Sequence, residues 1–158
     1  MSEQYVEIMI QSLRKKINVL DTIIKLDEEQ KEGLENPKLT PDEFDETVEK
    51  KSDMIKQLEQ LDSGFEKLFE RMVVELENNK DFYKDQILLM KDLIRQITDK
   101  SVEIQAQEAR NKELMTRKFA SIKTQARNVR KGAKAVTQYY QSMNKTGALD
   151  SQFWDQKK

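Results

Sequence analysis

The side chains that most often carry out chemistry in enzymes are scarce in this chain. Its 158 residues include no cysteine and no histidine, so it lacks a thiolate nucleophile and the side chain best suited to acid–base or metal chemistry near neutral pH. Acidic residues are abundant, but they follow helical charge patterns and no glycine-rich phosphate loop accompanies them. We therefore expect a protein that is not an enzyme and needs no cofactor, metal or small-molecule substrate.

The chemistry that remains is noncovalent binding, and one stretch near the C-terminus is patterned for it. Nine residues recur at alternating steps of four and three, the spacing of a helix that packs against other helices. We call them the C-terminal stripe: Met115, Phe119, Ile122, Ala126, Val129, Ala133, Val136, Tyr140 and Met143. Burying the large members at ~1.5–3 kcal/mol each would stabilise a complex by on the order of 10–20 kcal/mol. We predict that the stripe binds a helix of another protein or of a second copy of the chain.

The composition favours helices throughout the chain. Charged residues make up 36% of the sequence, which has only 4 glycines and 2 prolines to form turns. Apolar periodicity predicts helices over 3–32, 41–77 and 82–144, with a flexible tail over 145–158. We expect a single all-α domain spanning 1–158: an elongated antiparallel helical hairpin or three-helix bundle with a long, overhanging C-terminal helix.

Local signals mark the expected ends of these helices. Gly33 is placed to end the first helix in a left-handed conformation. Thr40 can cap the second helix through its hydroxyl, with Pro41 at the first helical position. Residues 78–81, Asn-Asn-Lys-Asp, are suited to a reversal, after which Asp81 could cap the third helix.

The expected helix lengths set how much of the stripe the chain can cover. At 1.5 Å per residue the second helix reaches about 54 Å, which places Pro41 alongside Ala120 of the third helix. Most of the stripe, from Phe119 to Met143, then overhangs the bundle and indicates a surface for a partner or for a second copy of the chain. A fold-back near Arg110 or Gly132 would instead make the stripe part of the core.

Acidic and basic residues are unevenly distributed along the chain. Residues 1–109 have an excess of acidic side chains, whereas residues 110–158 hold twelve basic against three acidic side chains. Nine basic residues accompany the stripe: Arg110, Lys112, Arg117, Lys118, Lys123, Arg127, Arg130, Lys131 and Lys134. They could form a nucleic-acid surface, but no motif for groove or base recognition accompanies them. An acidic partner helix, or the acidic first part of the chain, fits them better.

The last residues contain a second candidate for docking. Phe153 and Trp154 stand in an otherwise polar tail. They could anchor a second partner, or they could fold back on the bundle, and the sequence leaves both open. No apolar run approaches the ~18 residues that a membrane span requires, so we expect no membrane insertion and a soluble, cytoplasmic protein.

Three segments together carry a family resemblance. Residues 50–62 (KKSDMIKQLEQLD), 104–112 (IQAQEARNK) and 152–158 (QFWDQKK) resemble FlgN-type flagellar export chaperones of Gram-positive bacteria. The resemblance implies a cytosolic helper of flagellar type III export. It would bind the C-terminal amphipathic helix of hook-associated proteins, prevent their premature assembly and deliver them to the export gate. Asn111 matches the family's asparagine in the long helix, where a structural role is implied.

Two other functions remain compatible with the residues. The stripe could be a coiled-coil element through which the chain assembles with itself, including a homodimer in the absence of a client. The basic run could bind nucleic acid, the least favoured of the three functions.

Overall fold

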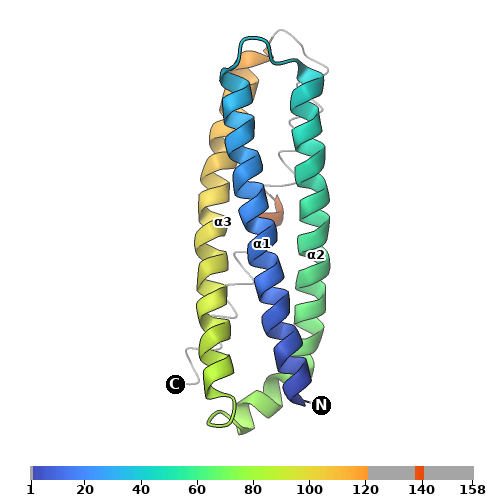
Figure 1. Cartoon of the computed structure of the whole chain (residues 1–158), viewed down its shortest axis with the longest axis vertical. Coiled ribbons are helices and arrows are strands. Elements are labelled where there is room, and N and C mark those ends of the chain that lie inside the picture. Colours follow the sequence, from blue (N-terminus) through green and yellow to red (C-terminus); the bar gives the residue numbers. More distant parts are fainter. Residues whose placement is uncertain (1, 121–137, 141–158) are drawn as a thin grey trace.

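The computed structural model describes residues 2–120 and 138–140, and its three main helices pack as a bundle (Figure 1). They are α1 (Ser2–Glu35), α2 (Pro41–Asn78) and α3 (Lys84–Lys118). The all-α class and the three-helix bundle predicted from the sequence are confirmed. In the described part of the chain, no helix is both long enough and apolar enough to cross a membrane.

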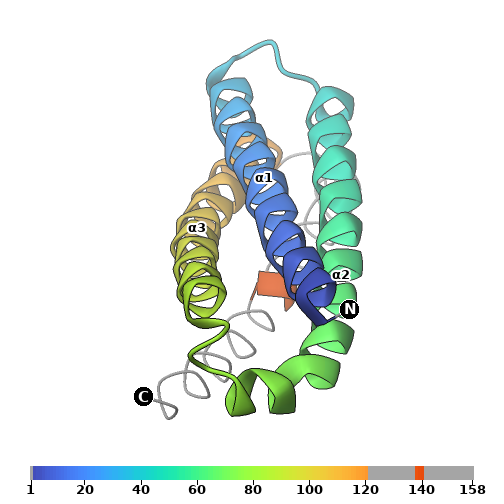
Figure 2. The ribbon, with the colours of Figure 1, turned by 60° about the horizontal axis from the view of Figure 1, so that its bottom comes forward.

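Helix α1 is the central element of the bundle. It packs along both α2 and α3, whereas the backbones of α2 and α3 do not come close to each other anywhere in the described ranges. Residues 138–140 are helical, and Figures 1 and 2 show them between α2 and α3, behind α1. The side of the bundle between α2 and α3 is therefore the one that a fourth element can reach.

The apolar side chains form two separate clusters. The main cluster runs along the bundle and includes Met9, Leu20, Leu58, Met90 and Ile104, all of which are fully buried. The loop-end cluster lies where α1 ends, α2 begins and α3 ends, at the top of Figure 1. It consists of Leu34, Phe44, Val48, Met115 and Phe119, with Leu39 and Leu114 packed against it.

The end of α1 differs from the sequence-based prediction. The helix continues through Gly33 to Glu35, and no described glycine has a positive φ, so Gly33 does not form a left-handed cap. Continuing the helix by two residues carries Leu34 into the loop-end cluster, where it is buried. The free energy gained by burying Leu34 outweighs the cost of a glycine inside a helix, which is about 0.5–1 kcal/mol relative to alanine. Asn36 and Pro37 follow at once and end the helix.

The start of α2 is as predicted. The Thr40 hydroxyl accepts a hydrogen bond from the Glu43 backbone N–H at 3.2 Å, and Pro41 occupies the first helical position. Thr40 has an extended backbone, as an N-cap residue does. This cap sets the direction in which α2 leaves the loop and so positions Phe44 in the loop-end cluster.

The reversal between α2 and α3 is also confirmed, but its cap is not. The chain turns at residues 79–83, and Asn79 donates from its side chain to the Glu75 carbonyl at the end of α2. Helix α3 begins at Lys84 with Tyr83 as its N-cap residue and without a side-chain cap, so Asp81 does not cap it. The turn instead buries Tyr83 in the main cluster, while Asp81 remains exposed.

Helix α3 ends earlier than the predicted residue 144. It stops at Lys118, where the Phe119 backbone N–H bonds to the Met115 carbonyl and residues 119–120 form a turn. The predicted alignment is correct, because the Phe44 and Phe119 rings are 6.0 Å apart and place the start of α2 beside the end of α3. Ending the helix here lets Phe119 pack against α2 rather than extend beyond the bundle.

Candidate binding surface

The structure places three members of the C-terminal stripe, and all three are buried by the chain's own helices. Met115 and Phe119 belong to the loop-end cluster, and Tyr140 belongs to the main cluster with no exposed surface. The expectation that the stripe overhangs is therefore wrong at Phe119 and Tyr140. The other six members lie outside the described residues, as do Phe153 and Trp154: Ile122, Ala126, Val129, Ala133, Val136 and Met143.

Tyr140 is fully buried in the main cluster, and we call this position the Tyr140 seat. Burial, together with the charges of Glu108 of α3, Asp27 of α1 and Asp62 of α2, raises the pKa of Tyr140 far above its usual value. Its buried hydroxyl has no hydrogen-bond partner among the described residues. Leaving such a group unpaired costs about 1–3 kcal/mol. Tyr140 is thus held by apolar contacts in surroundings that suit its hydroxyl poorly.

Tyr139 makes the polar contact that Tyr140 lacks. Its hydroxyl donates to Asp62 Oδ2 at 2.5 Å, and Asp62 also receives a hydrogen bond from Lys16 of α1 at 2.5 Å. The two tyrosine rings lie edge to face with centroids 5.3 Å apart. Burial and the neighbouring Asp62 carboxylate both raise the pKa of Tyr139. Residues 138–140 are therefore attached to the middle of α2, not extended beyond the end of the bundle.

A buried polar cluster beside the Tyr140 seat was missed by the sequence reading. We call it the Lys51 clasp: Lys51 Nζ of α2 donates to Asp27 Oδ1 at 3.1 Å, Gln30 Oε1 at 2.8 Å and Glu108 Oε1 at 2.7 Å. All four side chains are buried. Lys51 and Glu108 look like ordinary surface residues in the sequence. Only the position of Lys51 in the sequence indicates burial, because it lies between Val48 and Ile55 on the buried face of α2.

The protonation of the clasp follows from its burial. Removal from water, together with the neighbouring Glu108 carboxyl, raises the pKa of Asp27 to about 8 against the attraction of Lys51. Asp27 is then neutral at pH 7, because two carboxylates beside one ammonium would leave an uncompensated charge in the core. The clasp is then held by the ion pair between Lys51 Nζ and Glu108 Oε1, which are 2.7 Å apart.

Asn111 extends this polar cluster toward the end of the bundle. Its side-chain amide donates to the Asp27 carbonyl at 2.9 Å and to Gln30 Oε1 at 3.3 Å. Arg110, the preceding residue, donates to Asn111 Oδ1 at 3.2 Å. The side chain of Asn111 is almost fully buried, so it ties α3 to α1 from inside the bundle.

Arg110, Arg117 and Lys118, which belong to the described part of the basic run, bond within the chain. Arg110 Nη2 lies 3.4 Å from Glu28 Oε1 of α1, and Lys118 Nζ donates to the Asn36 carbonyl at 2.7 Å. Arg117 pairs with Glu113 one turn earlier on α3, and both side chains are largely exposed. The attraction expected between the basic C-terminal part and the acidic first part is therefore present in the Arg110–Glu28 pair.

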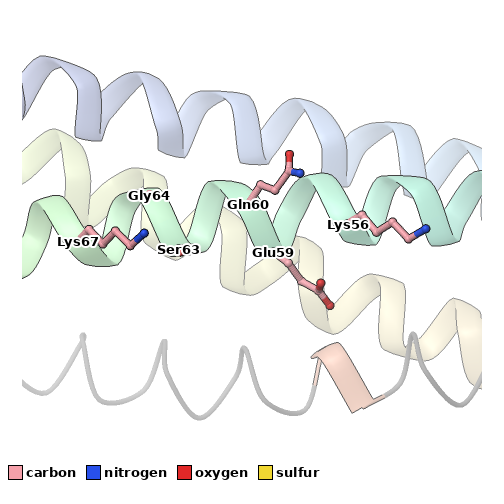
Figure 3. Close-up of a pocket in the computed structure, with 6 residues that line it drawn as sticks. All are labelled: Lys56, Glu59, Gln60, Ser63, Gly64 and Lys67. Carbon is pink, nitrogen blue, oxygen red and sulfur yellow. The ribbon is translucent and has the colours of Figure 1, made fainter.

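A shallow hollow follows the outer face of α2 (Figure 3). It is lined by Lys56, Glu59, Gln60, Ser63, Gly64 and Lys67, all from this one helix. Glu59 points toward residues 138–140, and its charge is among those that raise the pKa of Tyr139. No group of three or more acidic side chains arranged to hold a metal ion occurs among the residues of known position.

The comparison with known protein families gives one result. The FlgN protein family matches residues 1–147 of the chain. We found no match among curated proteins or among solved structures. FlgN proteins are non-enzymatic, cytoplasmic chaperones that bind hook-associated proteins for flagellar export. On the strength of a match over nearly its whole length, together with its all-α bundle, this chain belongs to the FlgN family of flagellar export chaperones.

Proposed function

We propose that the C-terminal stripe is where this chaperone receives the C-terminal amphipathic helix of its hook-associated client. Tyr140 then exchanges its seat in the bundle for contacts with the client. A helix laid in an apolar groove is a common mode of peptide recognition, and anchors at heptad spacing suit it. The proposed contact residues are Met115, Phe119, Ile122, Ala126, Val129, Ala133, Val136, Tyr140 and Met143.

The observation that supports this proposal most directly is the unpaired hydroxyl of Tyr140. A fully buried side chain whose hydroxyl is unpaired loses less free energy on leaving its site than one whose polar groups are all satisfied. The net free energy of this exchange is the difference between the contacts that Tyr140 makes with the client and those that it loses in the bundle. The apparent client affinity then equals the intrinsic affinity multiplied by the fraction of molecules in which the seat is vacant.

The basic side chains beside the stripe favour an acidic client helix. Lys112 and Arg117 are exposed on α3, and Arg110 and Lys118 are half-buried. Charges of this kind raise the rate of encounter more than the final affinity, and salt screens them. We expect client association to slow with increasing salt while dissociation changes little.

The proposal is tested by replacing two stripe residues with acids. The variant Ile122→Asp with Val129→Asp should abolish binding of a peptide that carries the client's C-terminal helix, measured by calorimetry. The helicity of the first two helices should stay intact in circular dichroism. Val102→Asp is the matched control, because Val102 is apolar, 56% exposed and outside the stripe. Client binding unchanged by the double substitution would place the client elsewhere.

A distance measurement tests the movement of Tyr140 directly. The chain has no cysteine, so two can be introduced and spin-labelled without background. Gln138 beside the seat and Ser63 on α2 are both exposed. The label-to-label distance should be short in the free chaperone and longer after addition of client peptide. A distance unaffected by saturating client would show that the seat stays occupied.

Two further interactions complete the proposal. The family resemblance implies delivery to the flagellar export gate, and Phe153 with Trp154 are the residues we propose for that contact. Replacing both with alanine should weaken binding to the gate's cytoplasmic domain without changing client affinity. In the absence of client, the stripe could pair with a second copy of the chain. Sedimentation would then show a dimer that the Ile122→Asp, Val129→Asp variant converts to a monomer.

A further inference from the structure

Side chains, and not a close approach of the backbones, connect α2 with α3 in the described ranges. Each packs on α1, and their backbones do not come close together in the described ranges. Residues 138–140 lie between them (Figure 2). Side chains must therefore set the distance between α2 and α3, and two of the contacts that connect the helices are defined by a distance between atoms or between rings. One is apolar, between Phe44 and Phe119 at the loop end; the other is the bond from Lys51 to Glu108.

The Lys51–Glu108 bond is suited to setting a distance. Its two atoms are 2.7 Å apart, and the two side chains are 3% and 5% exposed. Lys51 is also bonded to Asp27 and Gln30 on α1, so its ammonium group uses all three of its donors. A charged group satisfied in this way inside a core has no alternative partner of equal quality, and moving it a few tenths of an ångström is costly.

Tyr140 lies near the clasp along both helices, because it is buried in one cluster with Ile55 of α2 and Ile104 of α3, and each of these is four residues from a clasp residue. Asp27 and Glu108 are two of the three acids whose charges act on Tyr140, and the third is Asp62 on the same helix as Lys51. The space that Tyr140 occupies is thus bounded by the two helices that the clasp connects. A change in their separation must alter how Tyr140 fits.

We propose that Lys51 is a positioning residue: through its bond to Glu108 it sets the separation of α2 and α3 and thereby how firmly Tyr140 is held in its seat. The link to client binding rests on the proposed function, because there Tyr140 must leave before the client helix docks. In that setting a looser clasp raises the fraction of vacant seats and so raises the apparent client affinity.

The variant for the test is Lys51→Met combined with Glu108→Gln. It removes the cation and its anionic partner together, so no unpaired charge is left buried and the bundle can still fold. Circular dichroism verifies that it does. Spin labels on cysteines at Ser52 of α2 and Ala109 of α3, both exposed and each next to a clasp residue, report the separation. A second label pair at Glu46 and Glu113 reports the loop end.

The expected result is local to the clasp. The Ser52–Ala109 distance should become longer and more broadly distributed, while the Glu46–Glu113 distance stays as in the parent protein. Lys51→Arg, which keeps a cation between the carboxyls, should restore a single narrow distribution. The control variant is Lys100→Met with Asp21→Asn, which removes a 2.7 Å ion pair between α1 and α3 that does not involve α2. It should leave the Ser52–Ala109 distance unchanged.

The second readout is client affinity. In the Lys51→Met, Glu108→Gln variant, the client peptide should bind about tenfold more tightly, a difference of ~1.4 kcal/mol. An unchanged Ser52–Ala109 distance overturns the positioning role of Lys51, whatever the client does. A longer distance with unchanged client affinity leaves that role standing and instead contradicts the proposal that Tyr140 must leave.

Discussion

The loop-end cluster and the Lys51 clasp have the same structural role but rely on opposite kinds of interaction. Both connect α2 to α3, one through the rings of Phe44 and Phe119 and the other through the bond from Lys51 to Glu108. The apolar contact gains free energy from each atom that it removes from water, so it weakens gradually when trimmed. The polar contact balances a large desolvation cost against pairing, so it fails abruptly when one partner is lost. The first stabilises the bundle, and the second mainly specifies its geometry.

Breaking the clasp on one side should have the largest effect. Lys51→Met alone leaves the Glu108 carboxylate buried without its cation, which should lower the free energy of unfolding by about 3–5 kcal/mol. Urea unfolding measures it. The companion variant Lys51→Met with Glu108→Gln should lose much less. Equal losses in the two variants would mean that the unpaired charge is not the cause.

Truncating a side chain of the loop-end cluster should have the second-largest effect on stability. Phe119→Ala removes a ring that is 3% exposed and should cost about 3 kcal/mol, at the low end for a buried phenylalanine because the end of α3 can relax. The same urea experiment, repeated at pH 6 and pH 9, should give the same loss. A loss that varies with pH would contradict the apolar character of this contact.

A pH titration separates the two regions further. Asp27 has a pKa of about 8 in the folded chain and an ordinary value of 3.8, so between those values the folded state holds a proton that the unfolded state has released. The Asp27 contribution to stability is therefore full below about pH 4 and falls by at most ~1.4 kcal/mol per pH unit as pH rises toward 8. Lys51, Glu108 and Tyr140 face this carboxyl.

Asp27→Asn should remove this contribution. The difference in unfolding free energy between the parent and the variant should change steadily between pH 5 and pH 8. The matched exposed variant Asp99→Asn should show no such trend. A parallel pair of pH profiles for the parent and Asp27→Asn would show that Asp27 is ionised throughout.

A smaller effect is expected at the start of α2. Thr40→Ala removes the hydroxyl that accepts from the Glu43 N–H and should cost about 1 kcal/mol. Because the cap directs Phe44 into the loop-end cluster, hydrogen exchange should quicken there and not at the clasp. Thr40→Ser, which retains the hydroxyl, should behave as the parent in the same measurement.

The smallest effect is expected at Gly64, which lies far from both contacts. A Cβ at this position would meet no atom within 4 Å, and the glycine lies in the interior of α2. Gly64→Ala should therefore stabilise the chain by about 0.5–1 kcal/mol through helix propensity alone. A destabilised variant would reveal a contact that fills the hollow in Figure 3.

The sequence by itself determined the helical elements and the family. Apolar periodicity located α1, α2 and the first part of α3, and the Thr40-Pro41 cap and the turn after Asn78 were readable because they depend on neighbouring residues only. The alignment of Pro41 with Ala120 was also predictable, since it follows from helix length and a tight reversal.

The tertiary structure alone decided which polar residues enter the core and where Tyr140 lies. Lys51, Asp27 and Glu108 are distant in sequence, and none differs by type from the many charged residues around it. Only the packing of three helices brings them within bonding distance. Likewise, a heptad stripe predicts that a helix face is buried, but it does not identify the segment that buries it. Periodicity is a local property, whereas the choice of partner depends on the free energies of competing long-range contacts.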